Sequence, residues 1–140
     1  MEHDMKTLLL TLIFAASTSL FAQTGTGMKA QAENDLQTAV ESYEYCLQHD
    51  NAGVVESTLA NVVRFKLVNP EYDTEALSDD LVSLAQNGET ESLRFKAFLA
   101  NQFLNSGQLL SQLNDQEFDE DEHLFKTLAV QMQNELLTSR

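Results

Sequence analysis

The single cysteine is the first candidate for chemistry, because a thiolate is among the most nucleophilic groups that a side chain supplies. Cys46 precedes His49 by three residues, so on a helix the thiol and a possible base would share a face. Cys46 also follows an apolar stripe with Tyr43 and Leu47, where burial disfavours the thiolate. We therefore expect a buried, structural cysteine. With no Gly-x-Ser-x-Gly segment and no phosphate-binding glycine loop, the sequence predicts no catalytic residue and no cofactor.

An acidic segment, residues 115–122, is the second candidate, because clustered carboxylates attract calcium ions. A calcium-binding EF-hand loop starting at Asp115 needs glycine at its sixth position and glutamate at its twelfth, but the chain has Glu120 and Lys126. Glu120 and His123 form one Glu-x-x-His pair, which ferritin-like metal sites use twice. We expect solvated, helix-capping carboxylates and no metal ion. A small helical metal-binding protein or enzyme that uses this segment is the alternative hypothesis.

Two Arg-Phe-Lys tripeptides, residues 64–66 and 94–96, hold half of the eight basic residues. On neighbouring helices they would form a positive strip that attracts the carboxylates of a partner. The candidate partner-binding residues are Arg64, Lys66, Arg94 and Lys96. The alternative is that these cations neutralise Glu56, Glu89 and Glu91 of their own chain. We expect the phenylalanine of each tripeptide to be buried.

The charge balance limits the classes of partner. The chain of 140 residues has 22 acidic and 8 basic residues, a formal net charge of −14. Nucleic acid is excluded as a partner, because phosphate binding requires clustered lysine and arginine. An apolar content of 43% in a chain of this length suits one domain with a hydrophobic core. One cysteine rules out an intramolecular disulfide.

The N-terminal segment has the features of an export signal. An uncharged, mostly apolar run over residues 8–21 follows Lys6, and the small residue Ala22 precedes Gln23. This run is shorter than the roughly 20 residues that span a bilayer. Residues 1–22 thus resemble a bacterial secretory signal peptide. The resemblance implies cleavage after Ala22, a periplasmic or secreted product, and no stable membrane insertion afterwards.

Helical spacing of apolar residues dominates the rest of the chain, as in the series Leu36, Val40, Tyr43 and Leu47. No segment alternates polar and apolar residues over the length of a strand, so we predict an all-α protein. We expect helices near residues 31–49, 53–68, 74–86, 90–105 and 119–137, with a short turn over 107–113. The expected organisation is a signal peptide over 1–22, a flexible segment over 23–30 and a single helical domain over 31–140, with Met1 and Met5 both open as the true start.

Turn and capping residues mark the expected helix boundaries. Pro70 ends the second helix, since proline lacks an amide donor and biases Asn69 away from helical geometry. Gly88 closes the third helix. Asp119 and Glu122 have the spacing of a capping box for the last one. The fourth helix is apolar on most of its circumference, which predicts a central position.

The second and fourth expected helices form a repeat. Residues 47–68 correspond to residues 84–104 at a shift of about 37–40 residues. Leu93, Arg94 and Ala97 match the apolar, arginine and small positions in the second helix of a HEAT motif.

Through these features, residues 36–105 resemble the HEAT/armadillo group of α-helical repeat proteins. The resemblance implies stacked antiparallel helical hairpins, a short α-solenoid that binds other proteins or has a scaffolding role. An ordinary small helical bundle is the alternative fold. The sequence identifies neither the protein partner nor the oligomeric state.

Overall fold

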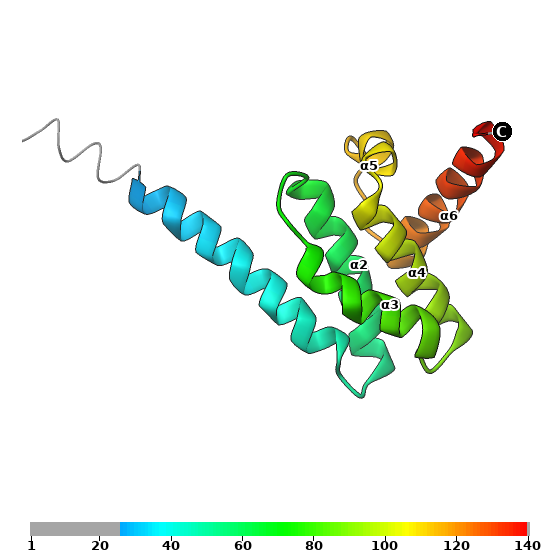
Figure 1. Ribbon diagram of the computed structural model, residues 1–140, viewed down its shortest axis with the longest axis horizontal. Coiled ribbons are helices and arrows are strands. Elements are labelled where there is room, and N and C mark those ends of the chain that lie inside the picture. The colour runs from blue at the N-terminus through cyan, green and yellow to red at the C-terminus, as the bar shows by residue number, and fades with distance from the viewer. Residues whose placement is uncertain (1–25, 140) are drawn as a thin grey trace, which may run out of the picture. The chain divides into compact units, whose positions relative to one another are not determined.

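The computed structural model describes residues 26–139, and every regular element in that range is helical (Figure 1). No strand occurs there, so the predicted all-α class is confirmed. Residues 26–47 form the first helix. It is followed by α2 (Ala52–Val68), the 3₁₀ turn η1 (Glu75–Leu77), α3 (Ser78–Asn87), α4 (Glu91–Asn105), α5 (Gly107–Leu113) and α6 (Asp121–Thr138).

The chain divides into two compact units, the first ending at Ala39 and the second beginning at Val40. In the first unit the helix already begins at residue 26, so residues 26–30 of the predicted flexible segment 23–30 are helical. Alanine, methionine and lysine there favour a helix. The predicted signal peptide over residues 1–22 lies outside the described residues.

Side-chain caps fix several helix starts. Asn51 Oδ1 accepts from the amides of Gly53 and Val54 at the start of α2. Thr90 Oγ1 accepts from the Leu93 amide at 3.1 Å at the start of α4. These local interactions explain why the sequence predicts both starts to within a residue or two.

The capping box predicted for the last helix is wrong. The residue before α6 is Glu120, not Asp119, and its side chain makes no capping hydrogen bond. Glu122 forms an ion pair with Lys96 of α4. The Glu122 carboxylate, which the predicted capping box requires, is therefore engaged in a contact with another helix.

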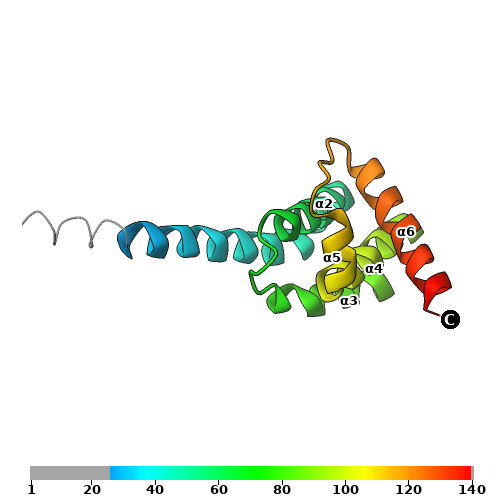
Figure 2. The ribbon, with the colours of Figure 1, turned by 90° about the horizontal axis from the view of Figure 1, so that it is seen from above.

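The core of the second unit is centred on α4, as the sequence predicts. This helix contacts α2, α3, α5 and α6, and Figures 1 and 2 show α3 on one side of it and α6 on the other. Its fully buried side chains include Ala97, Ala100 and Phe103. The neighbouring helices contribute further fully buried apolar residues, namely Leu59, Val62, Val63, Leu81, Leu113, Leu124 and Leu128.

Within the described residues, no helix is both long enough and apolar enough to cross a membrane.

Candidate functional site

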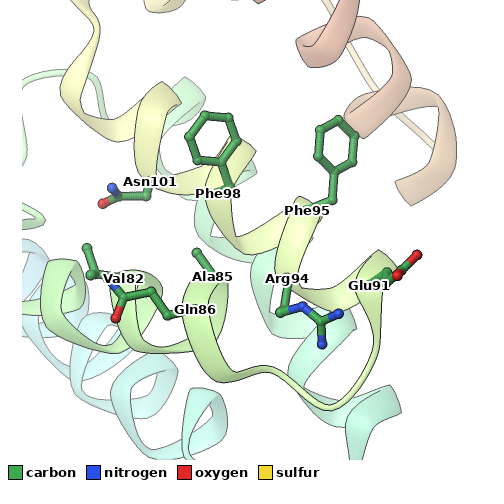
Figure 3. Close-up of a pocket in the computed structure, with 8 residues that line it drawn as sticks. All are labelled: Val82, Ala85, Gln86, Glu91, Arg94, Phe95, Phe98 and Asn101. Atoms are coloured by element: carbon green, nitrogen blue, oxygen red, sulfur yellow. The ribbon is translucent and has the colours of Figure 1, made fainter.

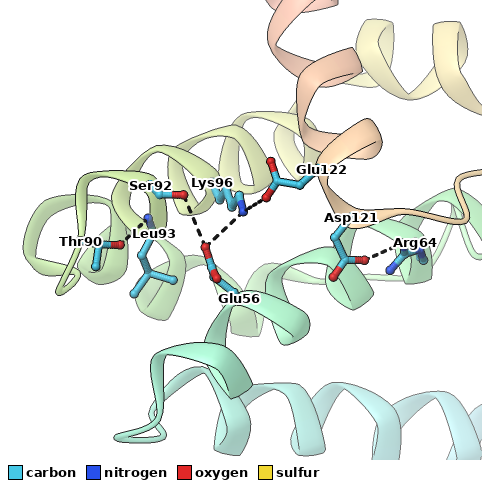
Figure 4. Close-up of polar contacts among 8 residues, drawn as sticks. All are labelled: Glu56, Arg64, Thr90, Ser92, Leu93, Lys96, Asp121 and Glu122. Carbon is cyan, nitrogen blue, oxygen red and sulfur yellow. Dashed lines mark hydrogen bonds and ion pairs between the residues drawn. The ribbon is translucent and has the colours of Figure 1, made fainter.

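Lys96 joins three helices and is the most enclosed of the predicted partner-binding residues (Figure 4). Its side chain is 11% exposed, and its Nζ lies 3.1 Å from Glu56 Oε1 in α2 and 2.5 Å from Glu122 Oε1 in α6. The Phe125 ring centroid is 5.7 Å from the same nitrogen. Burial alone would lower the pKa of Lys96, but hydrogen bonds and charges from Glu122 and Glu56 outweigh it, so the pKa is raised above 10.5. Lys96 is therefore a charged link within the fold.

Arg64 makes a second link to the start of α6. Its Nη2 lies 2.7 Å from Asp121 Oδ1 (Figure 4). Its Nε donates to the carbonyl oxygen of Phe118 at 3.2 Å. Both charged side chains are partly exposed, which screens their attraction. The guanidinium group still fixes the backbone that leads into α6.

The other two predicted cations donate to backbone carbonyl oxygens. Lys66 Nζ donates to Tyr72 at 2.7 Å, after the end of α2. Arg94 Nη1 donates to Gly88 at 2.7 Å and so braces the turn between α3 and α4. Each of the four thus has an acceptor in its own chain, and the binding role predicted for them stays a prediction.

The two Arg-Phe-Lys tripeptides do not lie side by side on α2 and α4. Glu56, near the start of α2, contacts Ser92 and Lys96 near the start of α4. Arg64 lies eight residues further along α2, about 12 Å of helix rise beyond Glu56. It therefore pairs with α6 and not with the positions beside Lys96.

The acidic segment 115–122 supplies ion-pair partners through two of its carboxylates, those of Asp121 and Glu122. His123 has its ring 5.6 Å from the Phe118 ring in an edge contact. No group of three potential metal ligands gathers in the described part of the chain.

Cys46 is half-buried, where full burial was expected. Leu47 takes the core position with 2% exposure, so the cysteine lies at the margin of the apolar stripe. The neighbouring His49 Nδ1 accepts from the Asn51 amide at 3.0 Å. That ring nitrogen is therefore engaged in the turn before α2.

An exposed aromatic pair on α4 was missed by the sequence analysis. Phe95 is 52% exposed and Phe98 is 42% exposed, although Phe95 was expected to be buried. With Val82 of α3 they line a groove of about 500 Å³, which we call the α3–α4 groove (Figure 3). Figure 3 shows both phenyl rings projecting from the same side of α4. The apolar composition of α4 hinted at these residues, but periodicity could not show which of its faces lacks a neighbour.

A second groove of about 560 Å³ is also lined by Phe98, and we call it the α4–α6 groove. Its apolar lining residues are Phe98 of α4, Leu109 of α5, and Met132 and Leu136 of α6, and its polar ones are Gln102, Ser106, Gln108, Glu135, Thr138 and Ser139. Two grooves therefore meet at one exposed phenylalanine of the central helix. A surface of this kind is typical of protein-interaction sites.

Comparisons with known proteins give no match: no family model, no curated protein and no solved structure is similar to this chain. The candidate site therefore rests on the geometry of the chain itself.

Proposed function

We propose that this chain is an exported, non-enzymatic helical module that binds a protein partner through the exposed aromatic face of α4. The observation that carries the proposal is the exposure of Phe95 and Phe98, 52% and 42%, on the most central helix. Both line the α3–α4 groove, and Phe98 also lines the α4–α6 groove. Aromatic side chains bury large areas on binding and are enriched at the centres of protein interfaces. A partner that covers this face would gain that apolar area.

The contact between α2 and α4 supports a repeat architecture for this module. Glu56 accepts hydrogen bonds from Ser92 and Lys96, residues 36 and 40 positions later. These separations bracket the shift of about 37–40 residues at which the two sequences correspond. In a solenoid, equivalent helices of adjacent repeats lie side by side and form an extended binding surface. A HEAT-like hairpin stack is therefore part of the proposal.

Export is the second part of the proposal, and its support is the sequence of residues 1–22. Intact mass spectrometry of the protein secreted by a bacterial host tests it. We expect a mature chain that begins at Gln23. Recovery of the uncut chain from the membrane fraction would contradict the proposed cleavage.

Site-specific photo-crosslinking tests the binding surface. A photoreactive phenylalanine analogue replaces Phe98 in the exported chain, and in a control it replaces Val68, which is 78% exposed at the end of α2. We expect one discrete crosslinked protein from position 98 and none from position 68. Equal crosslinking from the two positions would show nonspecific contact and overturn the proposed surface.

A further inference from the structure

The α4–α6 groove contains a carboxylate oxygen that lacks a hydrogen-bond donor. Glu135 Oε1 is buried, and no described group donates to it. Buried polar atoms in folded proteins nearly always have a partner, because an unpaired one keeps its full desolvation cost. Among the described residues Glu135 Oε1 is the only buried side-chain oxygen or nitrogen left in this state. Glu135 as a whole is half-buried and lines the groove, so its carboxylate can accept from a donor that an occupant supplies.

The surroundings of Glu135 are mixed and lack positive charge: four of the lining residues are apolar, and five are polar and neutral, namely Gln102, Ser106, Gln108, Thr138 and Ser139. Phe98 and the 69% exposed Leu136 lie at the surface of the groove, and the buried Leu109 also lines it. No lysine or arginine is among the described residues that line it. Four of the six described cations already donate to acceptors elsewhere in their own chain.

Charge complementarity then decides the kind of occupant. The chain has a net charge of −14, so its field attracts positively charged segments and repels acidic ones. A lysine or arginine that donates to a carboxylate forms a charge-assisted hydrogen bond, which is stronger than a neutral one. Rotation about the last side-chain torsion of Glu135 exchanges its two oxygens, so either can face the groove.

We propose that the α4–α6 groove binds an amphipathic helix of a partner protein, with an apolar side chain against Phe98 and a lysine or arginine that donates to Glu135. This inference rests on the proposed function and adds the chemistry of the partner to it. Apolar anchors at helical spacing, flanked by cations, are the complement of this groove.

Fluorescence titration with synthetic peptides tests the chemistry directly. The probe is an amphipathic peptide of about 18 leucine and lysine residues with one tryptophan, long enough to be helical when bound. This chain contains no tryptophan, so the signal comes from the peptide alone. A second peptide of the same pattern has glutamate in place of lysine. We expect saturable binding of the basic peptide and none of the acidic one.

Matched variants separate the groove from general charge attraction. Glu135→Gln keeps the shape of the side chain and removes its charge, and we expect it to weaken binding about tenfold or more. Glu117→Gln removes the same charge from an exposed site in the loop before α6, and we expect less than a twofold change. Phe98→Ala also weakens binding. We expect Glu135→Gln to weaken peptide binding by the same factor when Arg140→Ala is also present. That result would exclude Arg140, the last residue of the chain, as the donor to Glu135.

Three results would overturn the inference. Equal losses in the Glu135→Gln and Glu117→Gln variants would mean that only net charge attracts the peptide. Self-association abolished by Glu135→Gln, seen by sedimentation, would make a second copy the occupant. If the photo-crosslink from position 98 persists in the Glu135→Gln chain, the partner site stands but the proposed cation contact fails. If position 98 gives no crosslink even when Glu135 is intact, the proposed function itself is refuted.

Discussion

The two Arg-Phe-Lys tripeptides have the same sequence and opposite environments. In residues 64–66 the phenylalanine is buried and lies between two tyrosines, with ring centroids 5.7 Å from Tyr43 and 5.6 Å from Tyr72. In residues 94–96 the lysine is buried instead, and Phe95 is 52% exposed. The first tripeptide lies near the end of α2 and the second near the start of α4.

The difference shows that the phase of a helix, meaning its rotation about its own axis relative to its neighbours, decides which residue of a motif is buried. Adjacent residues on an α-helix point about 100° apart, so a rotation of about that size exchanges the buried phenylalanine for the buried lysine. On α4 this phase directs Phe95 outward and lets Lys96 reach two carboxylates. The repeated tripeptide is therefore a structural contact in one helix and a candidate binding surface in the other.

The largest expected effect separates the two phenylalanines. Phe65→Ala should lower the free energy of unfolding by about 3–5 kcal/mol, since it empties a buried site between aromatic rings. Phe95→Ala should change it by less than about 1 kcal/mol, because the ring is largely exposed. Urea unfolding followed by circular dichroism measures both values. Similar losses in the two variants would refute the assigned environments.

A glycine at the α3–α4 turn helps to fix the phase of α4. A Cβ at Gly88 would lie 2.6 Å from the carbonyl oxygen of Leu84 and 3.2 Å from Arg94 Cγ. We expect Gly88→Ala to destabilise the fold by about 1–3 kcal/mol through overpacking.

The control for this substitution is Gly107→Ala, because a Cβ there meets nothing within 4 Å. Its unfolding free energy should stay close to that of the parent chain or rise slightly. If both alanine variants unfold at the same urea concentration, the turn does not constrain α4.

The buried lysine should give a pH-dependent contribution. Lys96→Met should destabilise the fold by about 1–2 kcal/mol near neutral pH, since the carboxylates of Glu56 and Glu122 are only partly enclosed. The pKa of folded Lys96 is raised above 10.5, so its contribution is complete below that pH and is lost as pH rises through the folded value. Unfolding measured at several alkaline pH values should show the gap between parent and variant closing.

Lys126→Met is the matched control for the lysine measurement, because Lys126 is exposed on α6. We expect no pH-dependent gap for it. A gap that stays constant into the alkaline range for Lys96→Met would mean that packing, not charge, explains the destabilisation.

The smallest expected effect concerns the arginine of the first tripeptide. Arg64→Met should lower the free energy of unfolding by roughly 0.5–1 kcal/mol, because its ion pair with Asp121 is partly exposed. The loss should shrink in Asp121→Asn, which removes the other partner. A double-mutant cycle in low and high salt measures this coupling, and full additivity would deny that the two residues interact.

Local signals account for what the sequence predicted well. The starts of α2 and α4 depend on Asn51 and Thr90, whose caps involve only neighbouring residues. The central position of α4 followed from its apolar circumference. The exposure of Phe95 depends on where α3 and α6 lie beside α4, and the groove at Glu135 is built by residues of three helices. Neither feature has a signature within its own segment.

The attachment of α6 has a consequence for amide hydrogen exchange. Its first half is held by the buried Leu124, Phe125 and Leu128, whereas Leu136 and Leu137 in its last turns are 69% and 66% exposed. One continuous helix therefore has a strongly anchored half and a weakly anchored half. Its terminal amides should exchange with solvent through local fraying, while the amides near Phe125 should exchange only when the core opens. A partner that covers the α4–α6 groove would slow the terminal amides selectively, so exchange rates along this single helix would report occupancy of the groove.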